Sequence, residues 1–549
     1  MWNGPGDEDM TSGVTVGASA LPETVDVLVL GSGVAGLVAA LRAADAGARV
    51  CVAEKAALLG GTTSAGGGVM WAPATELSRS RGFQDSPADG AEYLSAAAGH
   101  VMSEHAIDWY IRTARAAVTY LTTRTRVRLT PLARPDYRGE WPGAAQGGRS
   151  LDNDAFDPSD FPGLADLLRP SSYFPPLTMA ERDGLNGRAP APEVLATRRK
   201  RGVRTMGGAL VGALAASALD RGIHITTEAR ATGLTRSGDH WQVAFRDTML
   251  RARSVVLATG GFEWSPALTD AFLPFSITAI SAPSNEGDGL RMGLSTGAAV
   301  ADMTAIWGVP VIVPPSQTYD GRPSGRMGNV EMTLPGSIVV NSSGERFVNE
   351  ALSYQDTSRM FGDTDPRTGR PRNIPAWLVF DHAYARRYPI AGSDTGAAPG
   401  WARTAETVES LAAACRIDAA GLPATITEFN QDAVRGHDSR FGRGDSPQDR
   451  FLGDATHLPN PCLAPLAEPP YSAIPLHPGV LGTSGGLRTD DDGRVLDWTG
   501  SPIAGLYAAG NVAASVFRNN YPGGGATIGS AVTRAFVAGA AAAVDRETA

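Results

Sequence analysis

Cysteine is scarce in this 549-residue chain, and its three residues, Cys51, Cys415 and Cys462, are far apart and odd in number. This excludes a disulfide framework and a cysteine-rich metal site, and it fits a reducing compartment. The eight histidines include no pair at metal-ligand spacing, so we predict no metal site. The N-terminal residues lack the basic and apolar regions of a signal peptide. No apolar run reaches the roughly 20 residues of a membrane span. We therefore expect a cytoplasmic protein, with peripheral membrane contact as the alternative.

Positive charge is also in short supply. The chain has 48 Lys and Arg against 57 Asp and Glu, with a net charge of −9 and no arginine-rich arm, which argues against nucleic acid as a partner. Glycine and proline, in contrast, are abundant at 65 and 38 residues. Much of the glycine lies in dense clusters, which indicates backbone packed closely against a ligand. The length predicts two domains or one elaborated large domain, and the small, polar residues 1–24 predict a flexible tail.

A dinucleotide-binding pattern opens the ordered chain. Residues 25–30 (VDVLVL) are apolar throughout, as in a strand buried on both faces, and they lead into GSGVAG at residues 31–36. An alanine-rich helix to residue 46, a second strand at residues 48–53 and an acid then follow. In this order the glycines permit a tight turn, close approach of a pyrophosphate and helix packing, and the acid binds ribose hydroxyls. The candidate cofactor residues are Gly31, Gly33, Val34, Ala35, Gly36, Glu54 and Lys55.

Three further glycine motifs favour FAD over NAD. Residues 60–68 (GGTTSAGGG) are too small and polar for a core segment and suit backbone beside an extended cofactor. Residues 255–261 (VVLATGG) and 505–511 (GLYAAGN) each end a predicted strand, so we expect one sheet whose carboxyl ends meet the same ligand. These motifs add the candidates Gly61, Thr62, Thr63, Ser64, Gly67, Gly68, Ala258, Thr259, Gly260, Gly510 and Asn511.

The last glycine run, residues 523–529 (GGGATIG), precedes an alanine-rich helix that ends near residue 543. A helix N-terminus placed there would stabilise negative charge on a reduced flavin ring. The candidates in this run are Gly525, Ala526, Thr527 and Ile528.

Taken in order, these motifs resemble the fumarate reductase/succinate dehydrogenase flavoprotein superfamily and, within it, most resemble the 3-ketosteroid Δ1-dehydrogenases. The resemblance implies an α/β fold. A Rossmann-like FAD-binding domain would be discontinuous, at residues 25–282 and 478–549, with an inserted α+β catalytic domain at residues 283–477 that caps the substrate. Asp288, between two glycines, resembles a family position near the cofactor. Succinate dehydrogenases attach flavin through a histidine near the position of Thr62, whereas the first histidine here is His100, so we expect non-covalent FAD.

Two departures from the superfamily argue against a dicarboxylate reductase. Those reductases carry an acid-acting arginine four places after the position of Glu350, where this chain has Tyr354. They also place a substrate-binding histidine before a T-x-G-G motif, where this chain has Gly482.

Four residues match the catalytic groups of the ketosteroid dehydrogenases. By resemblance, Tyr354 is the base, Tyr137 supports it, and the Tyr521 hydroxyl and the Gly525 N–H bind the substrate ketone. The implied reaction is FAD-dependent 1,2-desaturation of a 3-ketosteroid. A proton passes from carbon 2 to a tyrosine, a hydride passes from carbon 1 to flavin N5, and the two donors stabilise the enolate. The family often has Y-P-G-P-G in this loop, whereas residue 524 here is glycine.

Several alternatives stay open at this point: a flavin-dependent ene-reductase, a 4,5-desaturase of a related ketone and a non-catalytic flavin-binding protein. The resemblance implies a 3-ketosteroid or similar fused-ring ketone as substrate and a quinone as external electron acceptor. The apolar, proline-broken residues 161–177 are interpreted as a substrate-side loop. Four aromatic residues could line an apolar slot, although core packing is the commoner role: Trp141, Trp307, Phe347 and Phe517.

Overall fold

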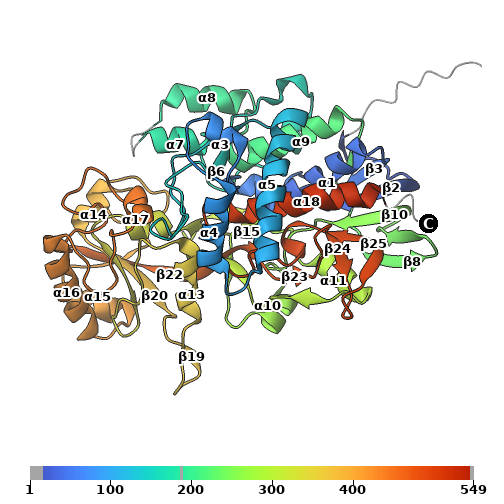
Figure 1. The fold of residues 1–549 in the computed structure, drawn as a ribbon. Helices are drawn as coiled ribbons and strands as arrows, with labels where there is room; N and C mark the ends of the chain where they lie inside the picture. The colour runs from blue at the N-terminus through green and yellow to red at the C-terminus, as the bar shows by residue number, and fades with distance from the viewer. Residues whose placement is uncertain (1–15, 186–189, 545–549) are drawn as a thin grey trace, which may run out of the picture.

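The computed structural model describes residues 16–185 and 190–544, in which two β-sheets are each surrounded by helices (Figure 1). The path through the larger sheet is β1 (Val16–Gly17), β7 (His224–Thr226), β3 (Val50–Ala53), β2 (Thr24–Leu30), β10 (Met249–Leu257), β25 (Pro502–Ala508) and β24 (Arg494–Leu496). A hairpin of β8 (Gly233–Ser237) and β9 (His240–Ala244) pairs with β10. The strands from β7 to β25 run parallel, so their carboxyl ends meet at one edge, as the glycine motifs predict.

Helices from both ends of the chain cover this sheet. α1 (Val34–Asp45) packs against α9 (Met206–Leu219) and α18 (Ala526–Val544), and α5 (Glu104–Arg124) crosses α18. In Figure 1 the red C-terminal helix α18 therefore lies beside the blue N-terminal helix α1. By length and composition α18 could cross a membrane, but 56% of its apolar window is buried inside the fold, as in a core helix.

The second sheet is built from the chain between β10 and β24. Its path is β16 (Arg326–Met327), β13 (Ile306–Ile312), β22 (Tyr471–Thr483), β20 (Ala376–Phe380) and β17 (Ser337–Asn341), and β22 also pairs with β11 (Thr278–Ala279) and β21 (Arg403–Ala405). Four helices surround its far end (Figure 1): α14 (His382–Arg387), α15 (Val408–Cys415), α16 (Gly421–Arg435) and α17 (Pro447–Leu452). The chain thus leaves the first sheet, builds the second and returns, which confirms the predicted fold class; the boundaries at residues 282 and 478 stay predictions.

Shorter elements fill the connections. On the first-sheet side they are α2 (Gly61–Ala65), β4 (Met70–Trp71), α3 (Glu76–Ser80), α4 (Pro87–Ala98), β5 (Leu129–Pro131), β6 (Ser150–Asn153), η1 (Pro158–Asp160), α6 (Leu164–Leu167), α7 (Met179–Leu185), α8 (Pro192–Lys200) and α10 (Pro266–Phe272). Further along the chain they are α11 (Asp288–Ser295), β12 (Val300–Ala301), β14 (Thr318–Tyr319), β15 (Arg322–Pro323), α12 (Asn329–Thr333), α13 (Tyr354–Arg359), η2 (Met360–Gly362), β18 (Thr364–Asp365), β19 (Arg370–Pro371), β23 (Gly486–Leu487) and η3 (Gly510–Val512).

Part of the segment at residues 1–24, for which we expect a flexible tail, forms regular structure. Val16 and Gly17 form strand β1 and pair in parallel with β7, because backbone groups at a sheet edge are satisfied by any extended segment of chain. Residues 1–15, to which the rest of that prediction applies, lie outside the described part.

Candidate active site

The first glycine turn lies at the carboxyl edge of the large sheet. Gly31 follows β2 with φ of +105°, and a Cβ there would collide with the Ala258 carbonyl, so the turn requires glycine. A Cβ on Gly36 would collide with the Gly31 carbonyl, which explains the close packing of α1 on β2. Gly33 caps α1 without a side chain, and the nearest atom to a Cβ there would be Thr63 Oγ1 at 3.5 Å. The backbone at the start of α1 is therefore open to a phosphate group.

The next parallel strand ends at the predicted acid. Glu54 is buried and its Oε2 accepts hydrogen bonds from the Ser32 N–H at 2.9 Å and the Ser32 hydroxyl at 2.6 Å. Its Oε1 accepts from the Ala56 N–H at 2.9 Å, so the carboxylate is fixed but keeps acceptor capacity. Lys55 faces outward and pairs with Asp288 at 2.8 Å. These two predicted cofactor residues therefore contact each other.

Hydroxyl groups line the segment after this acid. Thr63 Oγ1 accepts from the Val34 N–H at 3.1 Å, while Thr62 Oγ1 accepts from Asn285 Nδ2 at 2.8 Å. Within the described residues, the buried hydroxyls of Ser64 and Thr259 have no hydrogen-bond partner. Buried polar groups are normally satisfied, so these two orphans fit a polar cofactor such as FAD.

The remaining predicted cofactor residues approach the same edge. Ala258, Thr259 and Gly260 follow β10, and Gly510 and Asn511 follow β25, its parallel neighbour. The predicted positions that complete this set are Ala35 in the first turn of α1, Gly61 in α2, Gly67 and Gly68 before β4, and Ala526, Thr527 and Ile528 in the first turn of α18.

Three tyrosines from distant segments meet beside this edge. Tyr137 and Tyr521 stack with ring centroids 5.7 Å apart. The ring of Tyr354 meets both edge-on, at 5.4 Å from Tyr137 and 5.3 Å from Tyr521. Trp307 packs edge-on against Tyr521 at 5.3 Å. The structure therefore brings the three predicted catalytic tyrosines into one cluster.

Burial strongly perturbs the hydroxyls of Tyr354 and Tyr137. Burial raises the pKa of Tyr354 well above its usual value, and the neighbouring hydroxyls of Tyr137 and Tyr521 raise it further. Burial also raises the pKa of Tyr137, while its hydrogen bond with Tyr354 acts to lower it. The Tyr521 oxygen accepts a hydrogen bond from Thr527 Oγ1 at 3.2 Å, and its hydroxyl also forms a hydrogen bond with Tyr354.

The loop at residues 521–525 is held by its carbonyl groups. The Pro522 carbonyl accepts hydrogen bonds from the Tyr137 N–H at 3.2 Å and the Tyr93 hydroxyl at 2.5 Å. The Gly524 carbonyl accepts from the Ser150 hydroxyl at 2.8 Å, and the Gly525 carbonyl accepts from the Trp71 N–H at 3.0 Å. Gly525 has φ of +103°, and a Cβ there would collide with the Val69 carbonyl. No acceptor for the Gly525 N–H is found in the described part of the chain. This N–H and the Tyr521 hydroxyl can therefore both donate to a ketone oxygen.

Helix α13 contacts the chain segments that carry the other two tyrosines. It begins at Tyr354, and its Asp356 forms an ion pair at 2.9 Å with Arg138, the residue after Tyr137. Gln355 Nε2 donates to the Asn519 carbonyl at 3.4 Å, two residues before Tyr521. Sequence reasoning missed these contacts because the partners lie far apart in the chain.

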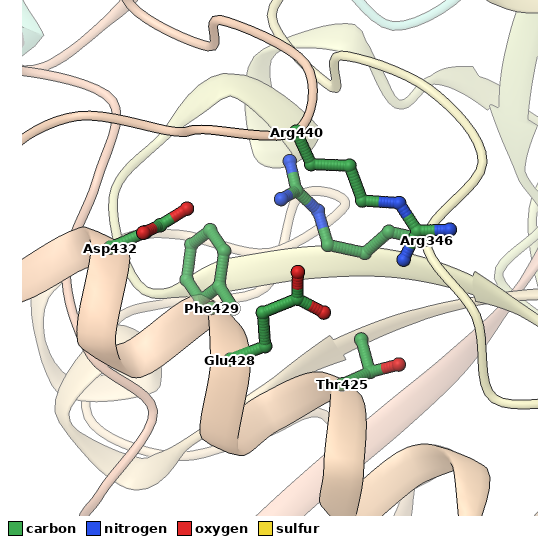
Figure 2. Close-up of a pocket in the computed structure, with 6 residues that line it drawn as sticks. All are labelled: Arg346, Thr425, Glu428, Phe429, Asp432 and Arg440. Carbon is green, nitrogen blue, oxygen red and sulfur yellow. The ribbon is translucent and has the colours of Figure 1, made fainter.

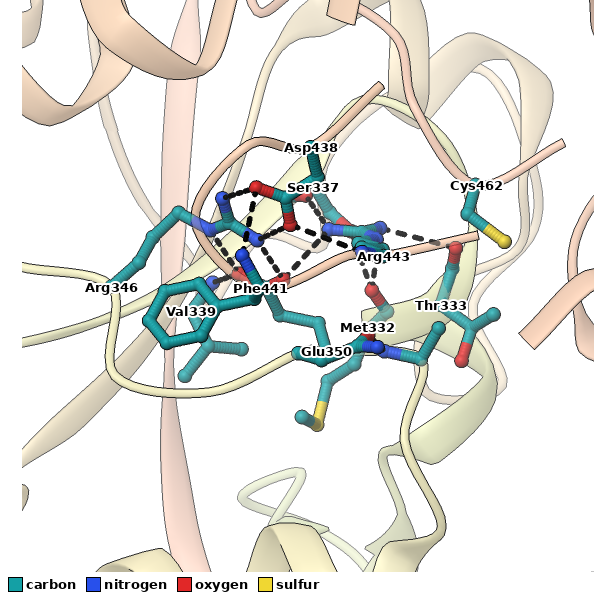
Figure 3. Close-up of polar contacts among 12 residues, drawn as sticks. Met332, Thr333, Ser337, Val339, Arg346, Glu350, Asp438, Phe441, Arg443 and Cys462 are labelled. Atoms are coloured by element: carbon teal, nitrogen blue, oxygen red, sulfur yellow. Dashed lines mark hydrogen bonds and ion pairs between the residues drawn. The ribbon is translucent and has the colours of Figure 1, made fainter. Parts of the chain in front are cut away.

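A buried ion network anchors the segment that leads to Tyr354 (Figure 3). Arg346 donates to both oxygens of Glu350, at 2.8 and 2.7 Å, and to both oxygens of Asp438, at 3.0 and 2.8 Å. Arg443 lies 3.2 Å from Glu350. Glu350 also accepts from the Val339 N–H at 3.1 Å, which fixes the segment to β17.

The four aromatic residues considered for an apolar slot have different surroundings. Trp307 has a ring contact with the tyrosine cluster, through Tyr521. Phe517 packs on Tyr110, Phe347 packs on Phe361, and Trp141 lies under Arg138.

A small cavity lies away from the tyrosines, against α16 (Figure 2). It is lined by Arg346, Thr425, Glu428, Phe429, Asp432 and Arg440. Its volume of about 10 Å³ holds about one water molecule, which is too little for a ring ketone.

Comparisons with known proteins find a family match and relatives that cover nearly the whole chain. The pattern of the family described as FAD binding domain matches residues 26–528. The chain is 39% identical over 532 residues to a 4-oxocyclohexanecarboxylate 2-dehydrogenase of Sinomonas cyclohexanicum, covering 94% of this chain and 92% of the relative. It is 35% identical to a 3-oxosteroid 1-dehydrogenase of Mycobacterium tuberculosis, covering 93% of this chain and 97% of the relative.

A solved structure is similar as well. The crystal structure of a 3-ketosteroid delta1-dehydrogenase from Sterolibacterium denitrificans, in complex with 1,4-androstadiene-3,17-dione, matches with a TM-score of 0.88. The two chains are 32% identical, and the match covers 96% of this chain and all of the other.

Proposed function

The chain belongs to the FAD binding domain family, among relatives that include 3-oxosteroid 1-dehydrogenases, and we propose that it desaturates the carbon–carbon bond beside a ring ketone. FAD is its cofactor, and its reaction class is the dehydrogenation of ketones. The observation that carries the proposal is the cluster of Tyr137, Tyr354 and Tyr521, whose ring centroids lie 5.3 to 5.7 Å apart.

Each residue of the cluster has a distinct role. The Tyr521 hydroxyl and the Gly525 N–H bind the ketone oxygen and stabilise the enolate that forms when the neighbouring carbon loses a proton. Tyr354 takes that proton, and Tyr137, whose hydroxyl is hydrogen-bonded to Tyr354, supports it as the base. FAD, when bound, supplies the acceptor for the hydride that leaves the next ring carbon.

The cofactor site follows from the sheet edge. We infer that the start of α1 and Glu54 hold the phosphate and ribose groups of FAD, and that the orphan hydroxyls of Ser64 and Thr259 face it. The attachment is non-covalent, and the external electron acceptor is a quinone.

Two substrate classes compete within this reaction. A 3-ketosteroid, desaturated between carbons 1 and 2, is supported by the 35% identical relative and by the structural match. A monocyclic keto acid is supported by the 39% identical 4-oxocyclohexanecarboxylate 2-dehydrogenase.

Anaerobic mixing of the yellow holoprotein with 4-androstene-3,17-dione and, separately, with 4-oxocyclohexanecarboxylate tests the proposal. We expect one of the two ketones to bleach the oxidised-flavin absorbance and to yield a stoichiometric product with a new double bond beside the carbonyl. Reduction of an enone by the dithionite-reduced protein, with no bleaching by either ketone, would instead identify an ene-reductase.

A further inference from the structure

Arg182, on α7, is a half-buried cation without a carboxylate partner. Within the described residues its one polar partner is Met179 Sδ, 3.9 Å from Nη1, and its guanidinium lies 5.3 Å from the centre of the Phe174 ring. The adjacent Asp183 pairs with Arg134 instead, at 2.6 Å. Burial and the charge of Arg134 lower the pKa of Arg182, while Tyr173 and Asp183 act in the opposite direction.

Arg326, on β16, is a second half-buried cation that lies against an aromatic ring. Its Nη2 donates to the Tyr173 carbonyl at 3.5 Å, and its guanidinium lies 5.0 Å from the centre of the Tyr173 ring. Its Nε is buried and has no hydrogen-bond partner among the described residues. Glu331 is nearby, but its carboxyl accepts from the Ala391 N–H at 3.0 Å, and burial raises its pKa toward the neutral form.

The two arginines flank one pair of aromatic rings. Tyr173 and Phe174 lie with ring centroids 4.5 Å apart, and each ring carries one of the two guanidinium groups. Arg182 lies on a helix that connects strands on the side of the first sheet, and Arg326 lies on a strand of the second sheet. The two arginines, like the three tyrosines, therefore come from both parts of the chain.

Each arginine has a neighbour in the chain that packs in an apolar cluster near the proposed catalytic groups. Met327, the residue after Arg326, packs in the same apolar cluster as Tyr354. Met179, on the same helix as Arg182, packs with Val69, whose carbonyl lies against Gly525. Side chains next to both arginines therefore pack in the apolar clusters at the proposed catalytic groups.

Burying a guanidinium without a counter-ion costs free energy, and a bound anion offsets this cost. Arginine binds carboxylates through two parallel hydrogen bonds. We propose that Arg182 and Arg326 form a subsite for a carboxylate of the substrate, so that the protein acts on a ring ketone that carries an acid group. This inference rests on the proposed function for the position of the ketone. The acid can belong to a monocyclic keto acid or to the side chain of a 3-oxosteroid acid.

Ligand binding can be measured apart from turnover in the FAD-loaded Tyr354→Phe protein, by the change in flavin absorbance. We expect 4-oxocyclohexanecarboxylate to bind about 10- to 100-fold more tightly than its methyl ester, because the ester lacks the charge. Arg182→Met and Arg326→Met should each reduce this preference by about tenfold or more, and Arg→Lys should retain part of it. Arg322→Met, an exposed arginine on the neighbouring strand β15, is the matched control and should leave the preference unchanged.

The same titration with 3-oxo-4-cholenoic acid and its methyl ester separates the two sources of the carboxylate. Unchanged FAD content and melting temperature show that each variant is folded. Equal affinity for acid and ester in both pairs, or a preference that survives both Met substitutions, would overturn the subsite. If the arginine-dependent preference is present but no ketone bleaches the wild-type flavin, the dehydrogenase proposal fails while the subsite stands.

Discussion

Tyr521 is placed to act as a donor to the ketone oxygen, because its own oxygen already accepts the Thr527 hydroxyl at 3.2 Å and its ring lies in the cluster with Tyr137 and Tyr354. Tyr521→Phe removes this donor while keeping the ring that stacks on Tyr137. We expect kcat to fall by about 10²- to 10³-fold, the typical loss of one oxyanion donor. Rapid-reaction measurement of flavin reduction by the ketone tests this, and an unchanged rate would remove Tyr521 from the mechanism.

The pH dependence follows from the raised pKa of Tyr354. Burial keeps this residue protonated at neutral pH, so the phenolate fraction grows with pH up to its raised pKa. We expect log kcat/KM for a neutral ketone to rise with a slope of about +1 between roughly pH 7 and pH 10. The highest pH at which this profile can be followed is set by the stability of the fold. Burial raises the pKa of other tyrosines, such as that of Tyr173 to about 12. The stability that these protonated tyrosines contribute is lost as pH rises from about 10 toward that value. A flat profile would exclude a tyrosine base.

At the scale of elements, α13 positions the base relative to its partners. The Arg138–Asp356 ion pair at 2.9 Å connects the Tyr137 segment to the first turn of this helix. We expect Arg138→Gln to lower kcat about 10- to 100-fold, because a misplacement of about 1 Å at a reacting group has that effect, while KM changes little. Arg359, at the end of α13, also pairs with Asp356 but is more exposed. Arg359→Gln is therefore the matched comparison and should lower kcat less.

A structural role for Arg138 can be separated from a positioning role. If the ion pair only stabilises the fold, Arg138→Gln should lower the melting temperature and leave kcat and its pH profile unchanged. If the ion pair positions Tyr354, the pH profile of kcat should shift relative to that of the wild type, while the FAD content stays unchanged.

The elements that could be predicted from the sequence are those with local patterns. The strand, glycine turn and helix at residues 25–46 are set by neighbours in the chain, and the structure confirms them at Thr24–Leu30 and Val34–Asp45. The three tyrosines came from family resemblance, and the structure brings them together. The Arg138–Asp356 pair spans 218 residues and leaves no local signal, and the same holds for the environments of Arg182 and Arg326. Long-range packing decides such contacts, so they needed the structure.

At the scale of the whole molecule, the buried ions at Arg346, Glu350 and Asp438 connect the catalytic segment to the second sheet. Glu350→Gln leaves Arg443 without its carboxylate partner and Arg346 with Asp438 alone, and we expect the free energy of unfolding to fall by about 3–5 kcal/mol at neutral pH. Glu468→Gln, which breaks an exposed pair with Arg386 in the same part of the chain, should cost at most about 1 kcal/mol. Urea denaturation in excess FAD measures both variants.

The sign of the pH effect gives this prediction a second test. The arginines hold the pKa of Glu350 and of Asp438 below their usual range, so the folded state binds these protons more weakly than the unfolded state. The stability they contribute is therefore present above the unfolded pKa values of about 4 and is lost as pH falls through the lower folded values. The difference between wild type and Glu350→Gln should accordingly narrow between about pH 7 and about pH 3.5. A difference that stays constant over this range would mean that the substitution acts through packing rather than through charge.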